Sequence, residues 1–339
     1  MSSPAKSTRP TQKHIAKLAN VSQATVSVVL SGTPDGSIPA STQRTVSRIA
    51  KALGYVPNRA AQTLRTQKTK TIACVVPDIT NPFYPALERG AQRSAETHGY
   101  DLLIYNTDGT RAKERKCLDQ LLQGRVDGIV GIFFHLTARE FLPLFDRQIA
   151  VVRVEARPQE TGRWPLDNLF VDNVAAARAA TDYLLDRGHR KVAMIAGNAG
   201  PHAARIQGYC DALKARGLST SIVLGPEFSE AQGYKSTRRL VRRAKPPSAI
   251  FAANDIMAIG AIMAARDNGL KVPDDLAIVG FDDIPIARLV SPPLTTVSQF
   301  QQKLGRRAVE MILERLQGAV QGPGRCEEAR FQLLTRQSA

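Results

Sequence analysis

The sequence has few of the features expected of a secreted, membrane or disulfide-stabilised protein. Its four cysteines are far apart, form no Cys-x-x-Cys pair and lie mostly in apolar or helix-like segments, which predicts reduced thiols: Cys74, Cys117, Cys210 and Cys326. The first ten residues contain no apolar segment of a secretory signal. No run approaches the roughly 18 apolar residues of a membrane span. We therefore predict a cytoplasmic protein without a membrane partner.

Catalytic signatures are missing as well. The chain has no Walker-A run, no Gly-x-Gly-x-x-Gly after its first predicted strand, no Gly-x-Ser-x-Gly and no His-Glu-x-x-His. No cysteine lies at metal-ligand spacing from any of the five scattered histidines, which are His14, His98, His135, His189 and His202. A kinase or dehydrogenase on an α/β scaffold is thus disfavoured, and we predict no enzyme activity, no metal and no cofactor.

Positive charge is concentrated at one end of the chain. The formal net charge is +16, and residues 1–70 hold eleven Lys and Arg against the single acid Asp35, so this segment carries +10 and the remaining residues +6. A basic module joined to a nearly balanced body is typical of proteins that bind a polyanion. A solubilising basic tail is the alternative interpretation.

The basic segment contains three short helical patterns, over residues 12–19, from Ser22 to Leu30 and from Ser41 to Leu53. Ser22 and Ser41 are suitable N-cap residues for the second and third helices. The first two patterns have the spacing of a helix-turn-helix, with Asn20 in the turn, where left-handed geometry is tolerated. An ordinary pair of helices is the alternative, but the pattern, the charge and the N-terminal position together favour DNA binding.

After Lys70, short apolar runs alternate with longer helical patterns, which predicts parallel sheets with helices on both faces. The predicted strands are 71–77, 101–106, 127–134, 149–154, 191–197, 248–252 and 276–281. A break near 155–170 and a length of about 260 residues favour two successive sheets. Since ligands bind at the carboxyl ends of strands in such sheets, we expect a site in the crevice between two lobes.

Several ordered motifs resemble the LacI/GalR (lactose-repressor-like) family of transcription regulators. Val-Ser-Gln-Ala-Thr-Val-Ser at 21–27 is similar to that family's recognition signature, and Gly54–Arg65 to its hinge. Further matching motifs lie at 81–83, 125–129, 184–191, 205–209, 253–255, 279–283 and 293–297. The resemblance covers roughly residues 11–318. It implies an all-α helix-turn-helix domain followed by an α/β two-lobed, periplasmic-binding-protein-like domain with doubly wound parallel sheets.

The resemblance also implies domain boundaries. They are a disordered tail at 1–10, a DNA-binding domain at 11–56, a hinge at 57–69, a ligand-binding and dimerisation domain at 70–320, and a C-terminal tail at 321–339. Within the ligand-binding domain, the first lobe comprises about 70–167 with 300–318, and the second about 168–295.

The same resemblance assigns DNA contacts. Gln23, Ala24 and Val28 occupy base-reading positions, where glutamine recognises an adenine edge and small apolar groups a thymine methyl. Val28 departs from the arginine common in the family. Phosphate contacts fall on Thr11, Ser22, Thr25 and Ser27. In the hinge, the resemblance places Asn58 and Arg59 near the DNA and Leu64 in a minor-groove step. The alternative interpretation is a simple linker, because without DNA the segment is too short for a stable helix.

For the effector, the resemblance implies a cleft lined by residues of both lobes: Asp78, Asn81, Phe83, Tyr84, Glu155, Arg205, Phe228, Asn254 and Asp282. Paired carboxylate and amide groups with aromatic rings suit a sugar or a sugar acid. Simpler interpretations are a helix entry at Asn81, a strand end at Asp282 and a core role for Phe228; His135 is a further candidate.

We thus expect a repressor that binds a pseudo-palindromic double-stranded operator as a homodimer. A small molecule in the cleft would change its affinity for DNA by shifting the lobe arrangement. A solute-binding protein of a transporter is the alternative for the body, but such a protein would carry a leader and no DNA module.

Overall fold

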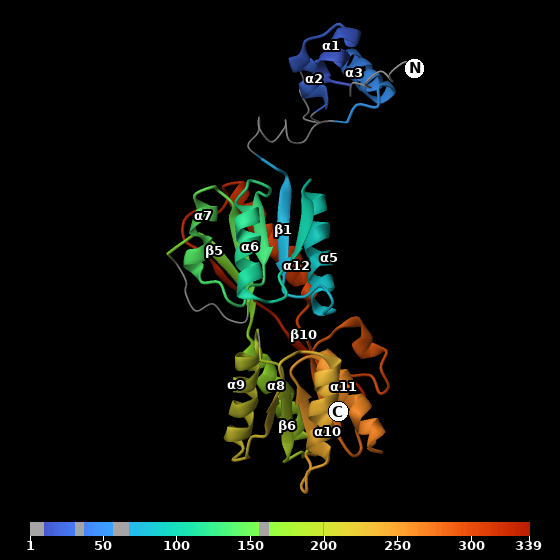
Figure 1. Ribbon diagram of the computed structural model, residues 1–339, viewed down its shortest axis with the longest axis vertical. Helices are drawn as coiled ribbons and strands as arrows, with labels where there is room; N and C mark the ends of the chain where they lie inside the picture. Colours follow the sequence, from blue (N-terminus) through green and yellow to red (C-terminus); the bar gives the residue numbers. More distant parts are fainter. Residues whose placement is uncertain (1–9, 31–36, 57–67, 156–162, 199) are drawn as a thin grey trace, which may run out of the picture. The chain divides into compact units, whose positions relative to one another are not determined.

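The structure is a computed structural model that describes residues 10–30, 37–56, 68–155, 163–198 and 200–339. The chain divides into two compact units, Met1–Thr69 and Lys70–Ala339 (Figure 1). Among the described residues, none of the helices combines the length and apolar character needed to cross a bilayer.

The first unit contains three helices: α1 Gln12–Ala19, α2 Gln23–Leu30 and α3 Ala40–Ala52. Their apolar sides meet in a small core of Ile15, Ala16, Val26, Val46 and Ala50. Four of these five residues are the apolar ones that the helical spacing places on the inner faces of α1 and α3, so the core follows directly from the sequence pattern.

Local capping sets the limits of the first two helices. The Thr11 hydroxyl accepts a hydrogen bond from the His14 amide, and Asn20 ends α1 in the left-handed conformation at φ 52° and ψ 47°. The Ser22 hydroxyl accepts a 3.0 Å hydrogen bond from the Thr25 amide. The prediction for Ser41 is wrong, because α3 already begins at Ala40.

The second unit contains two six-stranded sheets, each covered on both faces by helices. The strands of the first sheet run in the order β11-β5-β4-β3-β1-β2, and all its pairings are parallel. Its elements are β1 Thr71–Val76, α5 Phe83–Thr97, β2 Asp101–Asn106, α6 Arg111–Leu121, β3 Gly128–Gly131, η1 Ala138–Phe141, α7 Leu142–Phe145, β4 Ala150–Glu155, β5 Leu166–Val171, α12 Gln301–Leu316 and β11 Cys326–Ala329.

The second sheet runs β12-β10-β9-β8-β6-β7, with only the β10–β12 pair antiparallel among its described pairings. Its elements are α8 Asn173–Asp186, β6 Val192–Ala196, α9 His202–Ala215, β7 Ile222–Leu224, α10 Glu230–Val241, β8 Ala249–Ala252, α11 Asp255–Asp267, β9 Ala277–Asp282, η2 Pro285–Arg288, β10 Thr295–Ser298 and β12 Gln332–Leu334. Apolar clusters fill both faces of each sheet.

The chain passes between the two lobes three times, between β5 and α8, between β10 and α12, and between β11 and β12. Figure 1 shows the red-brown α12 returning among the cyan and green elements of the first lobe, where it packs against α5. The lobe boundary therefore differs from the predicted one at residue 167, because β5 continues the first sheet as far as Val171.

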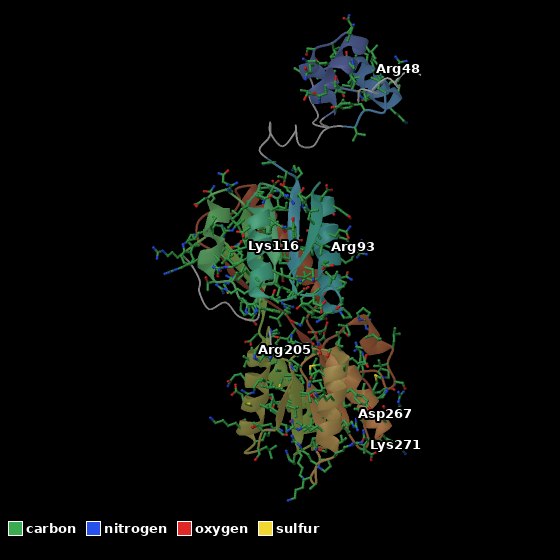
Figure 2. All side chains as sticks on the ribbon, in the orientation of Figure 1. Arg48, Arg93, Lys116, Arg205, Asp267 and Lys271 are labelled. Atoms are coloured by element: carbon green, nitrogen blue, oxygen red, sulfur yellow. The ribbon has the colours of Figure 1, made fainter. Side chains whose placement is uncertain are left out.

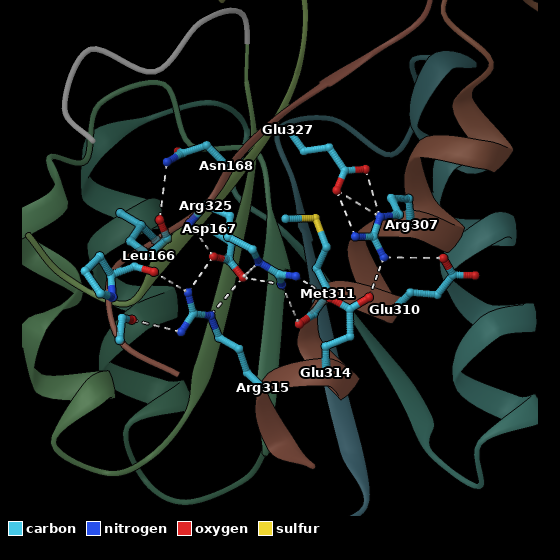
Figure 3. A network of polar contacts seen from close by, with 12 residues as sticks. Leu166, Asp167, Asn168, Arg307, Glu310, Met311, Glu314, Arg315, Arg325 and Glu327 are labelled. Atoms are coloured by element: carbon cyan, nitrogen blue, oxygen red, sulfur yellow. Dashed lines mark hydrogen bonds and ion pairs between the residues drawn. The ribbon is translucent and has the colours of Figure 1, made fainter. Parts of the chain in front are cut away.

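The C-terminal residues 321–339, predicted as a tail, instead complete both sheets through β11 and β12. A network of polar contacts holds this segment in place (Figure 3). Asp167, fully buried in β5, accepts hydrogen bonds from Arg315 of α12 at 2.6 Å and from Arg325 at 2.8 Å. Arg307 of α12 binds Glu327 of β11 at 2.8 Å. Charged strands of this kind lack the apolar pattern by which strands are predicted, so the sequence does not reveal them.

Candidate functional site

The described part of the second unit contains a cavity of about 880 Å³ between the two lobes. Residues that follow the carboxyl ends of strands line it in both sheets. In the first lobe these are Asp78 after β1, Asp108 after β2, and Phe134 and His135 after β3. In the second lobe they are Phe228 after β7, Asn254 after β8, Asp282 at the end of β9 and Gln299 after β10, together with Asn173, which begins α8 just after the crossover from β5. The site thus occupies the position at which open parallel sheets bind ligands.

Arg205 of α9 is the central cation of the cavity, and Figure 2 shows it where the two lobes meet. Its guanidinium donates a 2.8 Å hydrogen bond to the Asn173 side chain and lies 3.4 Å from a carboxylate oxygen of Asp282. It also stacks on Phe281, with 3.7 Å between the guanidinium carbon and the ring centroid. Burial lowers the pKa of Arg205, and the Asp282 carboxylate partly opposes this shift. These contacts hold the guanidinium in one orientation.

Asp282 links the cavity to a segment that joins the lobes. Its backbone has φ 116°, a left-handed conformation that is rare outside glycine. Its carboxylate accepts a 2.7 Å hydrogen bond from Gln299, and its carbonyl accepts one from the Gln301 side chain. Burial raises the pKa of Asp282 to about 6, although the neighbouring Arg205 acts in the opposite direction. A buried carboxylate that contacts the crossover to α12 is suited to couple ligand binding to lobe movement.

A second carboxyl group lies beneath the cavity. Asp255, at the start of α11, accepts hydrogen bonds from the Thr296 hydroxyl at 2.5 Å and the Ile284 amide at 2.9 Å. Burial and then the nearby Asp282 raise its pKa well above the ordinary range. Since Asp255 does not line the cavity, it serves to join α11 to the ends of β9 and β10.

Aromatic rings from both lobes line the cavity. Phe83 and Tyr84 of the first lobe pack edge to face with 5.2 Å between ring centroids. Gly200 of the second lobe leaves room for the Phe134 ring of the first, since a Cβ there would lie 3.0 Å from it. Rings on opposite walls can stack on the apolar face of a sugar.

The structure brings eight of the nine predicted effector residues to this one cavity, together with His135. The exception is Glu155, which ends β4 and whose side chain lies outside the described part of the structure. Three of the eight also have local roles. Asp78 accepts hydrogen bonds from Thr80, Asn81 accepts one from the Phe83 amide, and Asn254 caps α11. Their remaining polar atoms are what a ligand would contact.

Sequence reasoning missed seven polar residues of the lining: Asp108, Thr137, Arg153, Asn173, Glu227, Ser229 and Gln299. Arg153 is buried in β4, where its Nε donates a 3.0 Å hydrogen bond to Asn168. The charge of Arg153 inside an otherwise apolar strand could have indicated a site residue from the sequence alone. No such signal marks Gln299, because it follows the polar strand β10, which the sequence does not predict.

In the first unit, α2 presents its N-terminal end to solvent. Gln23 and Ala24 are exposed, whereas Thr25, Ser27 and Val28 are partly buried. The Ser22 and Thr25 hydroxyl oxygens are 2.9 Å apart, so one hydroxyl donates a hydrogen bond to the other. The other hydroxyl and that of the exposed Thr11 can donate a hydrogen bond to a phosphate. The predicted hinge residues Asn58, Arg59 and Leu64 lie outside the described residues. Within the described ranges, no group of three or more His, Cys, Asp or Glu side chains is arranged to hold a metal ion.

Comparison with known proteins matches both units. Residues 11–58 match the bacterial regulatory proteins of the lacI family, and residues 181–339 match the periplasmic binding protein-like domain. The HTH-type transcriptional repressor CytR of Escherichia coli K12 is 32% identical over 321 residues, which cover 94% of this chain and 93% of CytR. The ribose operon repressor of the same strain is 33% identical over 313 residues, covering 90% of this chain and 93% of the repressor.

Among solved structures, the complex of the transcriptional regulator CelR with cellobiose has a TM-score of 0.72 and 29% identity, and the match covers 98% of this chain and all of that one. The predicted fold class is therefore confirmed, as a helix-turn-helix domain followed by a two-lobed periplasmic-binding-protein-like domain.

Proposed function

This chain belongs to the lacI family of bacterial regulatory proteins and is a DNA-binding transcriptional regulator rather than an enzyme; from that premise, we propose that it is a repressor controlled by a small polyhydroxylated metabolite. The observation that carries the proposal is the cavity lined from both lobes by Arg205, Asp282 and aromatic rings.

The chemistry of the cavity supports a sugar or a sugar acid as effector. Carboxylates accept hydrogen bonds from hydroxyl groups, amides both donate and accept, and Arg205 can hold a hydroxyl or, in bidentate fashion, a carboxylate. The volume of about 880 Å³ is in the range of small-molecule sites. Two similar proteins are named for ribose and cellobiose, which agrees with this choice.

DNA recognition is assigned to the first unit. We propose that Gln23, Ala24 and Val28 face base edges in the major groove and that Thr11, Ser22, Thr25 and Ser27 contact phosphates. The hinge, with Asn58, Arg59 and Leu64, contacts the minor groove at the centre of the operator, where an inserted leucine costs a few kcal/mol of unstacking. A pseudo-palindromic site is read by two copies of such a module, so the working form is a homodimer.

Regulation follows from the three crossovers between the lobes. A ligand bound to Asp282, Arg205 and the first-lobe aromatics contacts both lobes and favours the arrangement in which all these contacts are made. Asp282 also receives hydrogen bonds from Gln299 and Gln301 of the crossover into α12. We propose that this movement changes the spacing of the two DNA-binding units and so the affinity for the operator.

Selection from sheared genomic DNA, with and without pooled sugars and sugar acids, tests the DNA-binding half of this proposal. We expect a few fragments to be enriched over bulk DNA and at least one compound to change their recovery. Recovery of bulk DNA alone, under both conditions, would contradict the proposal.

A thermal-shift screen of the same compounds tests the cavity. We expect the stabilising compound to lose its effect on Arg205→Ala but to keep it on Arg216→Ala, a variant of the partly exposed arginine that follows the same helix. A compound that stabilises both variants equally would place the effector elsewhere.

A further inference from the structure

The net charge of the second unit is confined to one short segment. Residues 71–339 carry a net charge of +6, and residues 231–245 alone contain six basic residues and no acidic one. The rest of residues 71–339 therefore has as many acidic as basic residues. The six are Lys235, Arg238, Arg239, Arg242, Arg243 and Lys245.

Helical geometry gathers three of these residues on one face of α10, and the other three follow at its carboxyl end. Lys235, Arg238 and Arg239 lie at i, i+3 and i+4 of α10 and are all exposed, so they share its outer face. The inner face is buried through Gly233, Ser236, Thr237 and Leu240. Arg242, Arg243 and Lys245 directly follow the helix and are exposed as well. We call this set of six cations the α10 cationic surface.

None of these six side chains forms an ion pair with any residue that the structure describes. Arg242 contacts the neutral side chain of Asn268 at 3.3 Å, and Arg243 that of Ser221 at 2.9 Å. Cations in the last turn of a helix stabilise its carboxyl end, which accounts for Arg238 and Arg239. That effect does not explain four further cations on the same surface.

We infer that the α10 cationic surface is a second DNA-binding surface, which contacts phosphates of duplex DNA without reading sequence. A helix rises 1.5 Å per residue, so the step from Lys235 to Arg242 covers about 10 Å. Four of the six cations lie within this length, and each strand of duplex DNA presents about three phosphates over it. The spacing of the cations is thus comparable with that of the phosphates along one strand.

The composition of the surface favours nucleic acid over the other polyanionic partners. A stable protein interface needs buried aromatic or aliphatic anchors, and an interfacial membrane helix needs an apolar face. None of the large apolar side chains that are exposed in the described structure falls within residues 231–245. Through this surface, the regulator holds a second DNA segment while its first unit binds the operator.

The test uses the full chain with a weakened first unit, in which the exposed cations Lys13, Lys17, Arg44 and Arg48 are changed to Gln. A labelled 20-base-pair duplex of random sequence is the probe. Adding Lys235→Gln, Arg238→Gln and Arg239→Gln should weaken its binding at least tenfold at 100 mM salt. The dependence of log K on log salt should become flatter by about 2 to 3, since each lost phosphate contact accounts for about 0.9.

The matched control removes the same charge from exposed cations of the first lobe through Arg93→Gln, Lys116→Gln and Arg125→Gln (Figure 2 labels the first two). It should leave both the affinity and the salt dependence unchanged. Equal losses in the two triple variants, or tighter binding of poly-glutamate than of the duplex, would overturn the proposal. Thermal unfolding of each variant checks that it is folded. Operator preference of the parent variant, in which only the four cations of the first unit are changed, tests the role of the first unit separately.

Discussion

The pH dependence of the protein's stability should reveal the titration of the Asp282 carboxyl group. Its folded pKa is about 6, whereas an ordinary aspartate titrates at 3.8, because burial disfavours its charged form. Between these values, the folded state holds a proton that the unfolded state has lost. The stability contribution of this group is therefore largest in acid and is lost as pH rises through about 6.

We expect the wild type to lose about 2 kcal/mol of stability relative to Asp282→Asn as pH is raised from about 4 to about 7. Denaturant unfolding of both proteins across this range measures the difference in slope. Parallel stability curves would mean that this carboxyl is not shifted upward.

Substitutions of Gln23 and of the cation Lys13 test whether base reading and attraction to the DNA backbone are separate within the proposed DNA-binding unit. Both side chains are exposed, so truncating them leaves the small core intact. Gln23→Ala should cost about 1–3 kcal/mol on the operator and relax preference at one base pair. Lys13→Gln should instead weaken all sequences alike and reduce the salt slope by about 1. Binding to a library of operator variants measures both effects, and identical profiles would place Gln23 away from the bases.

At the scale of elements, Asp167 joins three segments that are far apart in sequence. Burial alone would raise its pKa, but hydrogen bonds from Arg315 and Arg325 outweigh this and lower it below the ordinary value. The stabilisation is thus present at neutral pH and is lost in acid, as pH falls through the folded pKa. The carboxylate of β5 thereby secures α12 and β11 in the first lobe.

Removing this charge should leave two arginines without their shared partner. We expect Asp167→Asn to lower the free energy of unfolding by about 3–5 kcal/mol at neutral pH. Arg306→Gln, which removes an exposed i,i+4 pair with Glu310, should cost less than about 1 kcal/mol. Urea unfolding measures both, and similar small losses would show that the network contributes little.

At the scale of the whole molecule, we propose that effector and operator binding are linked through the crossover into α12. Linkage requires that the effector change operator affinity by the same factor as the operator changes effector affinity, typically about 5- to 150-fold. Gln301→Leu removes the hydrogen bond to Asp282, so we expect this factor to move toward 1. Titrations of each ligand in the absence and presence of the other measure it. The control is Gln302→Leu, which changes the exposed neighbouring residue. An unchanged coupling factor in both variants would exclude coupling through the Gln301 hydrogen bond.

Local patterns along the chain were sufficient to predict part of the fold. Helical spacing and capping predicted α1 and α2 within a residue or two, and strand–helix alternation predicted the sheet core of the second unit. The resemblance of the motifs to a known family implied Arg205, Asn254 and Asp282, which the fold brings to one cavity. The helices and the sheet core follow from short-range chemistry, in which each residue's neighbours are close along the chain.

Local patterns were not sufficient to show which polar segments become strands, since this depends on contacts between distant parts of the chain. β5, β10 and β11 contain Asp167, Asn168, Thr295 and Glu327, and they form strands because partners distant in sequence satisfy their polar groups. For the same reason, the structure alone revealed Gln299 beside Asp282 and showed that the last residues complete both sheets. Burial of a polar side chain becomes favourable only when the fold supplies its partner, and the linear pattern does not contain that information.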